Sequence, residues 1–115
     1  MRDYRKYDVW KLGHEITLQI YALTKEFPKK EQFGIISQMR RAAYSIPSNI
    51  SEGCGRESDA EFKRFLIISR GSASELEYFT VLAKDLGYLN QSSYTKVNDD
   101  VNKVKRSLNN LIQKI

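Results

Sequence analysis

The chain has 115 residues, 41% hydrophobic and 29% charged, a composition typical of one folded globular domain and not of a disordered chain. Nineteen lysines and arginines against 14 aspartates and glutamates give a formal charge of +5, which favours a polyanionic partner without requiring one. No apolar run approaches the roughly 20 residues that span a bilayer, and a lone cysteine fits a reducing compartment, so we expect a cytoplasmic protein.

The first predicted helix covers residues 8–27, with Asp8 as its N-cap and Pro28 ending it. The second covers residues 31–52. Pro47 lies inside the second predicted helix. It removes one backbone N–H donor and clashes with the carbonyl four residues earlier, so we expect a kink or a local break there. Gly53 and Gly55 then end this helix, because glycine suits the left-handed conformation of a C-cap.

The third predicted helix covers residues 58–86 and the fourth residues 91–115. Ser58 and Glu61 have the spacing of a capping box, in which each side chain bonds the backbone N–H of the other residue. Gly87 is expected to end the third helix. In all four segments the apolar residues recur every three or four positions, as on one face of a helix.

These four segments predict the fold class. No segment alternates apolar and polar residues with period two, so strands are not expected. The connections are short, and consecutive helices joined by short loops pack antiparallel as neighbours. We therefore expect a single all-α domain over residues 1–115, an antiparallel up-down-up-down four-helix bundle.

The positive charge is concentrated in the first and last segments. Residues 1–30 hold seven basic and four acidic side chains, and residues 91–115 hold five basic and two acidic ones. In an antiparallel bundle these segments can be neighbours, so together they form a candidate surface for nucleic-acid phosphates. Solvated helix faces explain the same charges without a ligand. The candidate residues are Arg2, Arg5, Lys6, Lys103, Lys105 and Arg106.

A second set of polar residues surrounds Pro47 and continues into the third helix. Ser45, Asn49 and Glu52 step by four and three and so share one face beside the apolar one. Polar groups so close to a core need partners, which predicts an internal network, a subunit interface or, less favoured, a ligand site. The whole set is Arg40, Arg41, Ser45, Asn49, Glu52, Arg56, Arg70 and Glu75.

Catalytic, metal and cofactor sites are not indicated. The only histidine, His14, has no glutamate three residues before it, as a di-metal bundle would require. Cys54 lies in a Gly-Cys-Gly loop beside Arg56, which can activate a thiol, but no histidine is near in sequence. The same loop lacks the glycine and lysine pattern of a nucleotide site, although Arg56 and the amides of the third helix could hold one phosphate. Helix capping explains the glycines without a ligand, and we favour that interpretation.

At three places the sequence resembles the family of 23S ribosomal RNA intervening-sequence proteins. The first is YRKYDVW at residues 4–10, and the second is SQMRRAAYSIPSNISEG at residues 37–53. The third runs from GRES at residues 55–58 through SRGS at residues 69–72 to LAKDLGYL at residues 82–89. The resemblance covers nearly the whole chain.

The resemblance implies a bacterial four-helix bundle that assembles into a ring, usually a pentamer, and has no assigned enzyme activity. A related branch, the accessory proteins of diversity-generating retroelements, binds nucleic acid and a reverse transcriptase. We therefore expect a non-enzymatic homo-oligomer without a cofactor or a metal, with RNA or DNA as its candidate ligand. The alternative is an adaptor for another protein, with no role in nucleic-acid binding.

Overall fold

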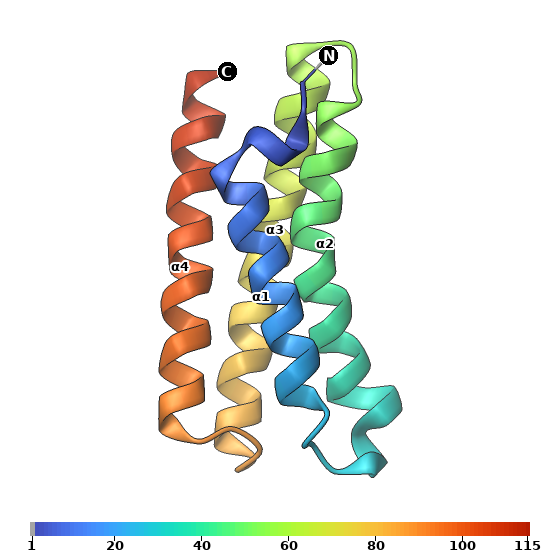
Figure 1. The fold of residues 1–115 in the computed structure, drawn as a ribbon, viewed down its shortest axis with the longest axis vertical. Coiled ribbons are helices and arrows are strands. Elements are labelled where there is room, and N and C mark those ends of the chain that lie inside the picture. Colours follow the sequence, from blue (N-terminus) through green and yellow to red (C-terminus); the bar gives the residue numbers. More distant parts are fainter. Residues whose placement is uncertain (1) are drawn as a thin grey trace.

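The computed structural model describes residues 2–115 and contains four long helices: α1 at Asp8–Thr24, α2 at Ser37–Cys54, α3 at Asp59–Asp85 and α4 at Gln91–Lys114. Successive helices run in opposite directions, so both termini lie at the same end (Figure 1). Each helix packs against two neighbours, in the order α1, α2, α3, α4 and back to α1. The predicted four-helix bundle is confirmed, and its longest dimension is 43 Å.

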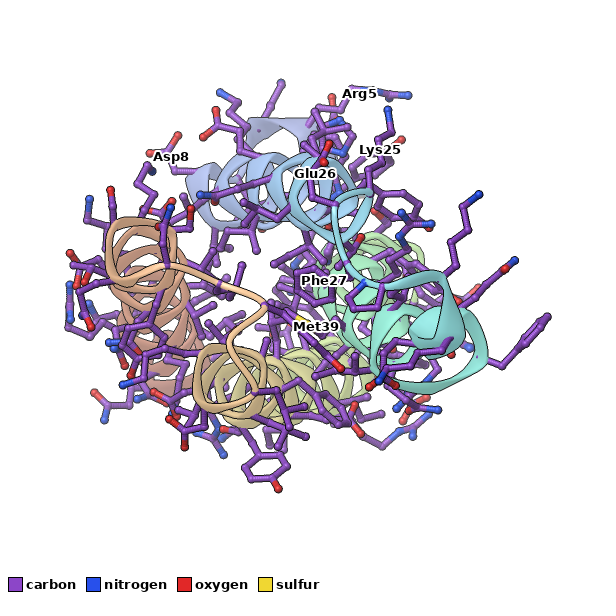
Figure 2. The ribbon with its side chains drawn as sticks, turned by 90° about the horizontal axis from the view of Figure 1, so that it is seen from below. Arg5, Asp8, Lys25, Glu26, Phe27 and Met39 are labelled. Atoms are coloured by element: carbon purple, nitrogen blue, oxygen red, sulfur yellow. The ribbon has the colours of Figure 1, made fainter. Side chains whose placement is uncertain are left out.

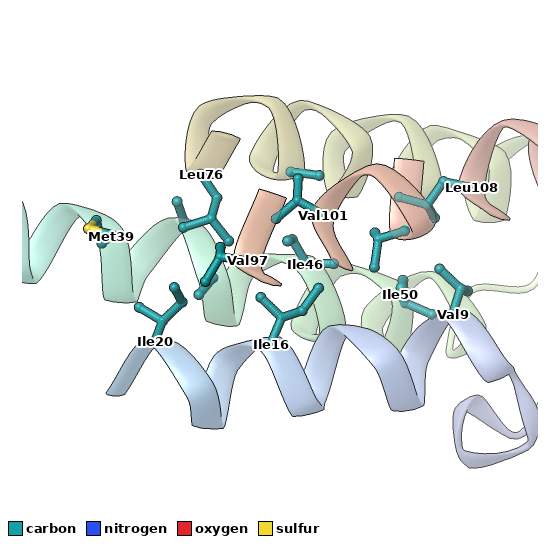
Figure 3. Close-up of a cluster of buried hydrophobic side chains, with 14 of the residues drawn as sticks. Val9, Ile16, Ile20, Met39, Ile46, Ile50, Leu76, Val97, Val101 and Leu108 are labelled. Atoms are coloured by element: carbon teal, nitrogen blue, oxygen red, sulfur yellow. The ribbon is translucent and has the colours of Figure 1, made fainter. Parts of the chain in front are cut away.

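The core is built from one apolar row of each helix. Ile16 of α1, Ile46 of α2, Leu76 of α3 and Val101 of α4 are each at most 1% exposed (Figure 3). Burying such a side chain stabilises the fold by about 1.5–3 kcal/mol. Viewed along its axis in Figure 2, the bundle has its charged side chains pointing outward around this core.

Two helix boundaries of the N-terminal half differ from the sequence prediction. Tyr7, not Asp8, is the N-cap of α1, and the helix ends at Thr24 instead of continuing to Phe27. The chain leaves the helix there, and Phe27 is nevertheless buried at the end of the bundle. The apolar spacing therefore identified a core residue correctly but placed it in the wrong element.

The predicted helix over residues 31–52 is wrong as a single regular helix. A 3₁₀ turn at Lys29–Glu31 and a π-helical turn at Gln32–Ile36 precede α2. Gly34 has φ −111° and ψ −117°, outside the helical region, so the chain bends there. Glycine has no Cβ and reaches such conformations at little cost.

The break expected at Pro47 does not occur, because α2 continues through it to Cys54. Proline has no N–H, which leaves the carbonyl of Ala43 without its usual helical donor. The hydroxyl of Thr17 in α1 lies 3.1 Å from that carbonyl and 2.8 Å from the carbonyl of Gly13. A Cβ at Gly13 would lie only 3.0 Å from a methyl of Ile46, so glycine permits the close helix approach that brings Thr17 to Ala43.

Replacing Thr17 by valine is therefore expected to lower the free energy of unfolding by about 1–3 kcal/mol, because the buried Ala43 carbonyl loses its donor. Urea denaturation followed by circular dichroism measures the change. Thr80→Val is the matched control, since the Thr80 hydroxyl bonds a carbonyl of its own helix, that of Leu76. Equal losses in the two variants would contradict this role of Thr17.

The remaining capping predictions are confirmed in part. Gly87 has φ +83° and ends α3 as expected, but Gly55 is right-handed with φ −82°, so the left-handed cap predicted for α2 is wrong. Gly53 serves packing instead, because a Cβ there would lie 2.9 Å from the Cβ of Phe65. The Ser58 hydroxyl accepts from the Glu61 amide at 3.1 Å, while the Glu61 carboxylate accepts from Arg64 instead of completing the capping box.

Candidate nucleic-acid interface

The N-terminal segment and the C-terminal part of α4 lie side by side. A hollow of about 370 Å³ is lined by residues 6–9 on one side and by Ser107, Asn110, Leu111 and Lys114 on the other. The antiparallel arrangement produces this contact because α1 begins at the end of the bundle where α4 finishes (Figure 1). The proximity of the two basic segments, expected from the sequence, is therefore present in the structure.

Two of the six predicted phosphate contacts already have carboxylate partners. Arg2 pairs with Asp59 and lies over the ring of Phe62, with its guanidinium carbon 4.1 Å from the ring centroid. Lys105 of α4 pairs with Glu77 of α3 at 3.1 Å. Their side chains are 27% and 28% exposed, so both are held against the bundle. These two residues stabilise local structure and are poorly placed for a ligand.

The other four predicted residues, Arg5, Lys6, Lys103 and Arg106, are exposed, and none forms an ion pair within residues 2–115. Lys114 has the same character and was missed by the sequence analysis. It follows Lys103 by eleven residues, which is close to three helical turns, so the two lie on one face of α4 about 16 Å apart. We call Lys6, Lys103, Arg106 and Lys114 the terminal basic edge.

The structure places the polar residues around Pro47 in several separate contacts. Arg41 donates to both carboxylate oxygens of Glu75 at 2.9 and 2.8 Å, which links α2 to α3. On the same side, Arg56 pairs with Glu52 at 3.0 Å. Asn49 donates to the carbonyl of Ser45 at 2.7 Å, a contact within α2.

The other two members of that set face elsewhere. Arg40 donates to the hydroxyl of Thr24 at 2.8 Å and lies over the ring of Tyr21, so it joins α2 to α1. Arg70 donates to Asn109 at 2.9 Å, which joins α3 to α4. The eight residues therefore do not form one internal network, because their contacts lie between α2 and α3, between α2 and α1, between α3 and α4, or within α2 and its C-terminal turn.

Cys54 is buried, with 1% of its surface exposed. Burial raises the pKa of its thiol, an effect that the nearby Arg2 opposes only in part. A raised pKa lowers the thiolate fraction at neutral pH, and the thiolate is the reactive form. The position of Cys54 thus disfavours nucleophilic chemistry at this residue.

Metal-binding and membrane-spanning features were also sought among residues 2–115. No three histidine, cysteine or acidic side chains in this range come together as a set that could hold a metal ion. None of the four helices combines the length and the apolar character needed to cross a bilayer.

Comparisons with known proteins agree with this architecture. A family model described as 23S rRNA-intervening sequence protein matches residues 5–110. A crystal structure of a protein of unknown function from the S23 ribosomal protein family of Bacteroides thetaiotaomicron VPI-5482 is similar, with a TM-score of 0.84 and 28% sequence identity. The match covers 90% of this chain and 97% of that chain. No curated protein matches significantly.

Proposed function

We propose that this chain, which belongs to the family of 23S rRNA-intervening sequence proteins, is a non-enzymatic module that binds nucleic acid, with RNA favoured over DNA as the ligand. The observation that carries the proposal is the terminal basic edge, whose exposed cations from two chain segments form no ion pair within residues 2–115. Such cations can exchange their counterions for phosphates without first breaking an ion pair. A cytoplasmic location in bacteria belongs to the same proposal.

The geometry of the edge suits a nucleic-acid backbone better than a single small anion. Lys103 and Lys114 are about 16 Å apart along α4, and Arg106 lies between them in sequence. Such a row can contact several consecutive phosphates, which position a strand without reading its sequence. We therefore expect affinity that depends strongly on salt and weakly on base sequence.

Homo-oligomerisation is the second part of the proposal and rests on exposed apolar side chains. On α3, Ile67 is 42% exposed, Ile68 40% and Tyr78 60%. Between Ile67 and Tyr78 a Cβ added to Gly71 would meet no atom within 4 Å, so a neighbouring molecule can approach the α3 backbone closely. A closed ring, with five subunits as the expected size, would give a total formal charge of about +25 from five copies of +5. Light scattering of the purified protein tests this part.

The alternative function is a protein adaptor, and one feature favours it. Tyr21, Phe33, Ile36, Arg40 and Tyr44 contribute to a hollow of about 300 Å³ between α1 and α2. Phe33 is 91% exposed there, and exposed apolar surface of this kind marks protein contacts. Under this alternative a specific partner binds irrespective of nuclease treatment, and the purified protein does not bind RNA.

Titration of a fluorescently labelled oligouridine with the purified protein tests nucleic-acid binding. We expect saturable binding, measured by fluorescence anisotropy at about 50 mM salt, that weakens by tenfold or more at about 200 mM as counterion release loses its driving force. An oligomer of unrelated sequence should bind within a few-fold. Absence of binding at the lower salt concentration would exclude the proposed function.

A further inference from the structure

A row of aromatic side chains lies at the N-terminal end of α1. The ring centroids of Tyr4 and Trp10 are 4.9 Å apart at 57°, and those of Trp10 and His14 are 5.2 Å apart at 6°, which is nearly parallel. The guanidinium carbon of Arg5 lies 4.7 Å from the centroid of Tyr4. We call Tyr4, Trp10 and His14 the aromatic row.

The last ring of the row is more exposed than the other two. Tyr4 and Trp10 are half-buried and pack against the core, which fixes the N-terminal segment to the bundle. His14 is exposed and does not belong to the core. It stacks on Trp10 from the following helical turn. Packing of the fold therefore accounts for Tyr4 and Trp10, and it leaves unexplained an exposed ring held parallel to an indole.

Two exposed cations, Arg5 and Lys11, lie near the aromatic row. A hollow of about 410 Å³ beside Tyr4 is also lined by Asp3, Arg5 and Ser51. Lys11, three residues before His14 on α1, is exposed with only a 3.9 Å contact to Asp8. Aromatic rings bordered by basic side chains are the arrangement by which proteins bind single-stranded nucleic acid, because bases stack on the rings while phosphates meet the cations.

From the exposed ring of His14, held parallel to Trp10 with cations near it, we infer that the aromatic row stacks an unpaired base on His14, in a single-stranded RNA that also contacts the terminal basic edge. The inference rests on the proposed function and adds a base contact to it. A surface that bound only phosphates would not need the exposed ring of His14. Stacking tolerates any base, since every base has a π-face, so the weak sequence dependence expected above is retained.

Trp10 is the only tryptophan of the chain, so its fluorescence reports directly on this site. We expect oligouridine at low salt to quench Trp10 emission with the same midpoint as the anisotropy change of the labelled strand. Inorganic polyphosphate carries the charges without bases and should bind without this quenching. His14→Ala should weaken oligouridine binding about fivefold or more, and His14→Phe, which keeps a ring, should restore it.

The other outcomes separate the two proposals. Binding of oligouridine with unchanged Trp10 emission and equal affinity of His14→Ala would overturn the stacking site and leave the proposed function standing. Equal quenching by polyphosphate would also overturn it, as would a His14→Ala variant that keeps its affinity but forms a smaller assembly, since the row would then be a subunit contact. Absence of any binding would overturn both proposals.

Discussion

Replacing Phe62 by alanine is expected to lower the free energy of unfolding by about 3–5 kcal/mol. Phe62 lies in the first turn of α3 and is 1% exposed. Its ring centroid is 5.9 Å from that of Tyr7 and 4.1 Å from the guanidinium carbon of Arg2, so it fixes the N-terminal segment to the bundle. The truncation would leave a cavity and would also remove the surface on which Arg2 lies.

Urea denaturation measures this loss. Phe33→Ala is the matched control because Phe33 is 91% exposed, and its truncation should change the free energy of unfolding by no more than about 0.5 kcal/mol. A loss below 1 kcal/mol for Phe62→Ala, or similar losses for both variants, would contradict the assignment of Phe62 to the core.

The second large effect concerns nucleic-acid binding. Changing Lys103, Arg106 and Lys114 together to glutamine should weaken oligouridine binding at low salt by about tenfold or more, because three phosphate contacts are lost. None of the three forms an ion pair within residues 2–115, so the fold should not be affected. Fluorescence anisotropy gives the affinity, and circular dichroism gives the helix content.

A control with the same change in net charge is available at the opposite end of the bundle. Lys25, Lys29 and Lys30 are exposed and also have no ion-pair partner in the described part of the chain. Their change to glutamine should leave the affinity within about twofold, since only the long-range field is altered. If both triple variants lost affinity equally, binding would follow net charge and the terminal basic edge would have no special role.

The fold could be predicted from the sequence because the apolar spacing that indicates each helix is a local feature. The three- and four-residue spacing that places Ile46 and Val101 in the core is a property of each helix alone. Where a distant residue decides the outcome, the prediction was wrong. Pro47 predicts a break by local rules, yet the helix continues through it, and the hydroxyl of Thr17 on another helix lies 3.1 Å from the carbonyl that the proline deprives of a donor.

The candidate site was predictable in outline for the same reason. The clustering of charge in the terminal segments, together with antiparallel packing, placed Lys6 beside α4. The pairing of Arg2 with Asp59 joins residues 57 positions apart, and that of Lys105 with Glu77 joins residues 28 apart, so neither could be read from spacing. Lys114 could have been predicted as part of the basic surface, because eleven residues are close to three helical turns and place it on the same face of the helix as Lys103.

Asp100 shows a further limit of sequence analysis. It is 6% exposed, although charged residues are rarely buried without a partner. Lys96, one turn earlier on α4, donates to its carboxylate at 2.5 Å, and this bond raises the pKa of the Lys96 ammonium group. The spacing of four residues was visible in the sequence, but it is shared by many exposed pairs, so it does not indicate burial.

The dependence of oligouridine affinity on salt, compared between the native chain and the Lys103, Arg106 and Lys114 triple variant, tests the central claim most directly. For a single strand that contacts the four cations of the terminal basic edge, log affinity should fall against log salt with a slope of about −3. The variant keeps only Lys6 of this edge and should show a slope of about −0.7. Equal slopes for the two proteins, or affinity that does not change with salt, would contradict binding at this edge.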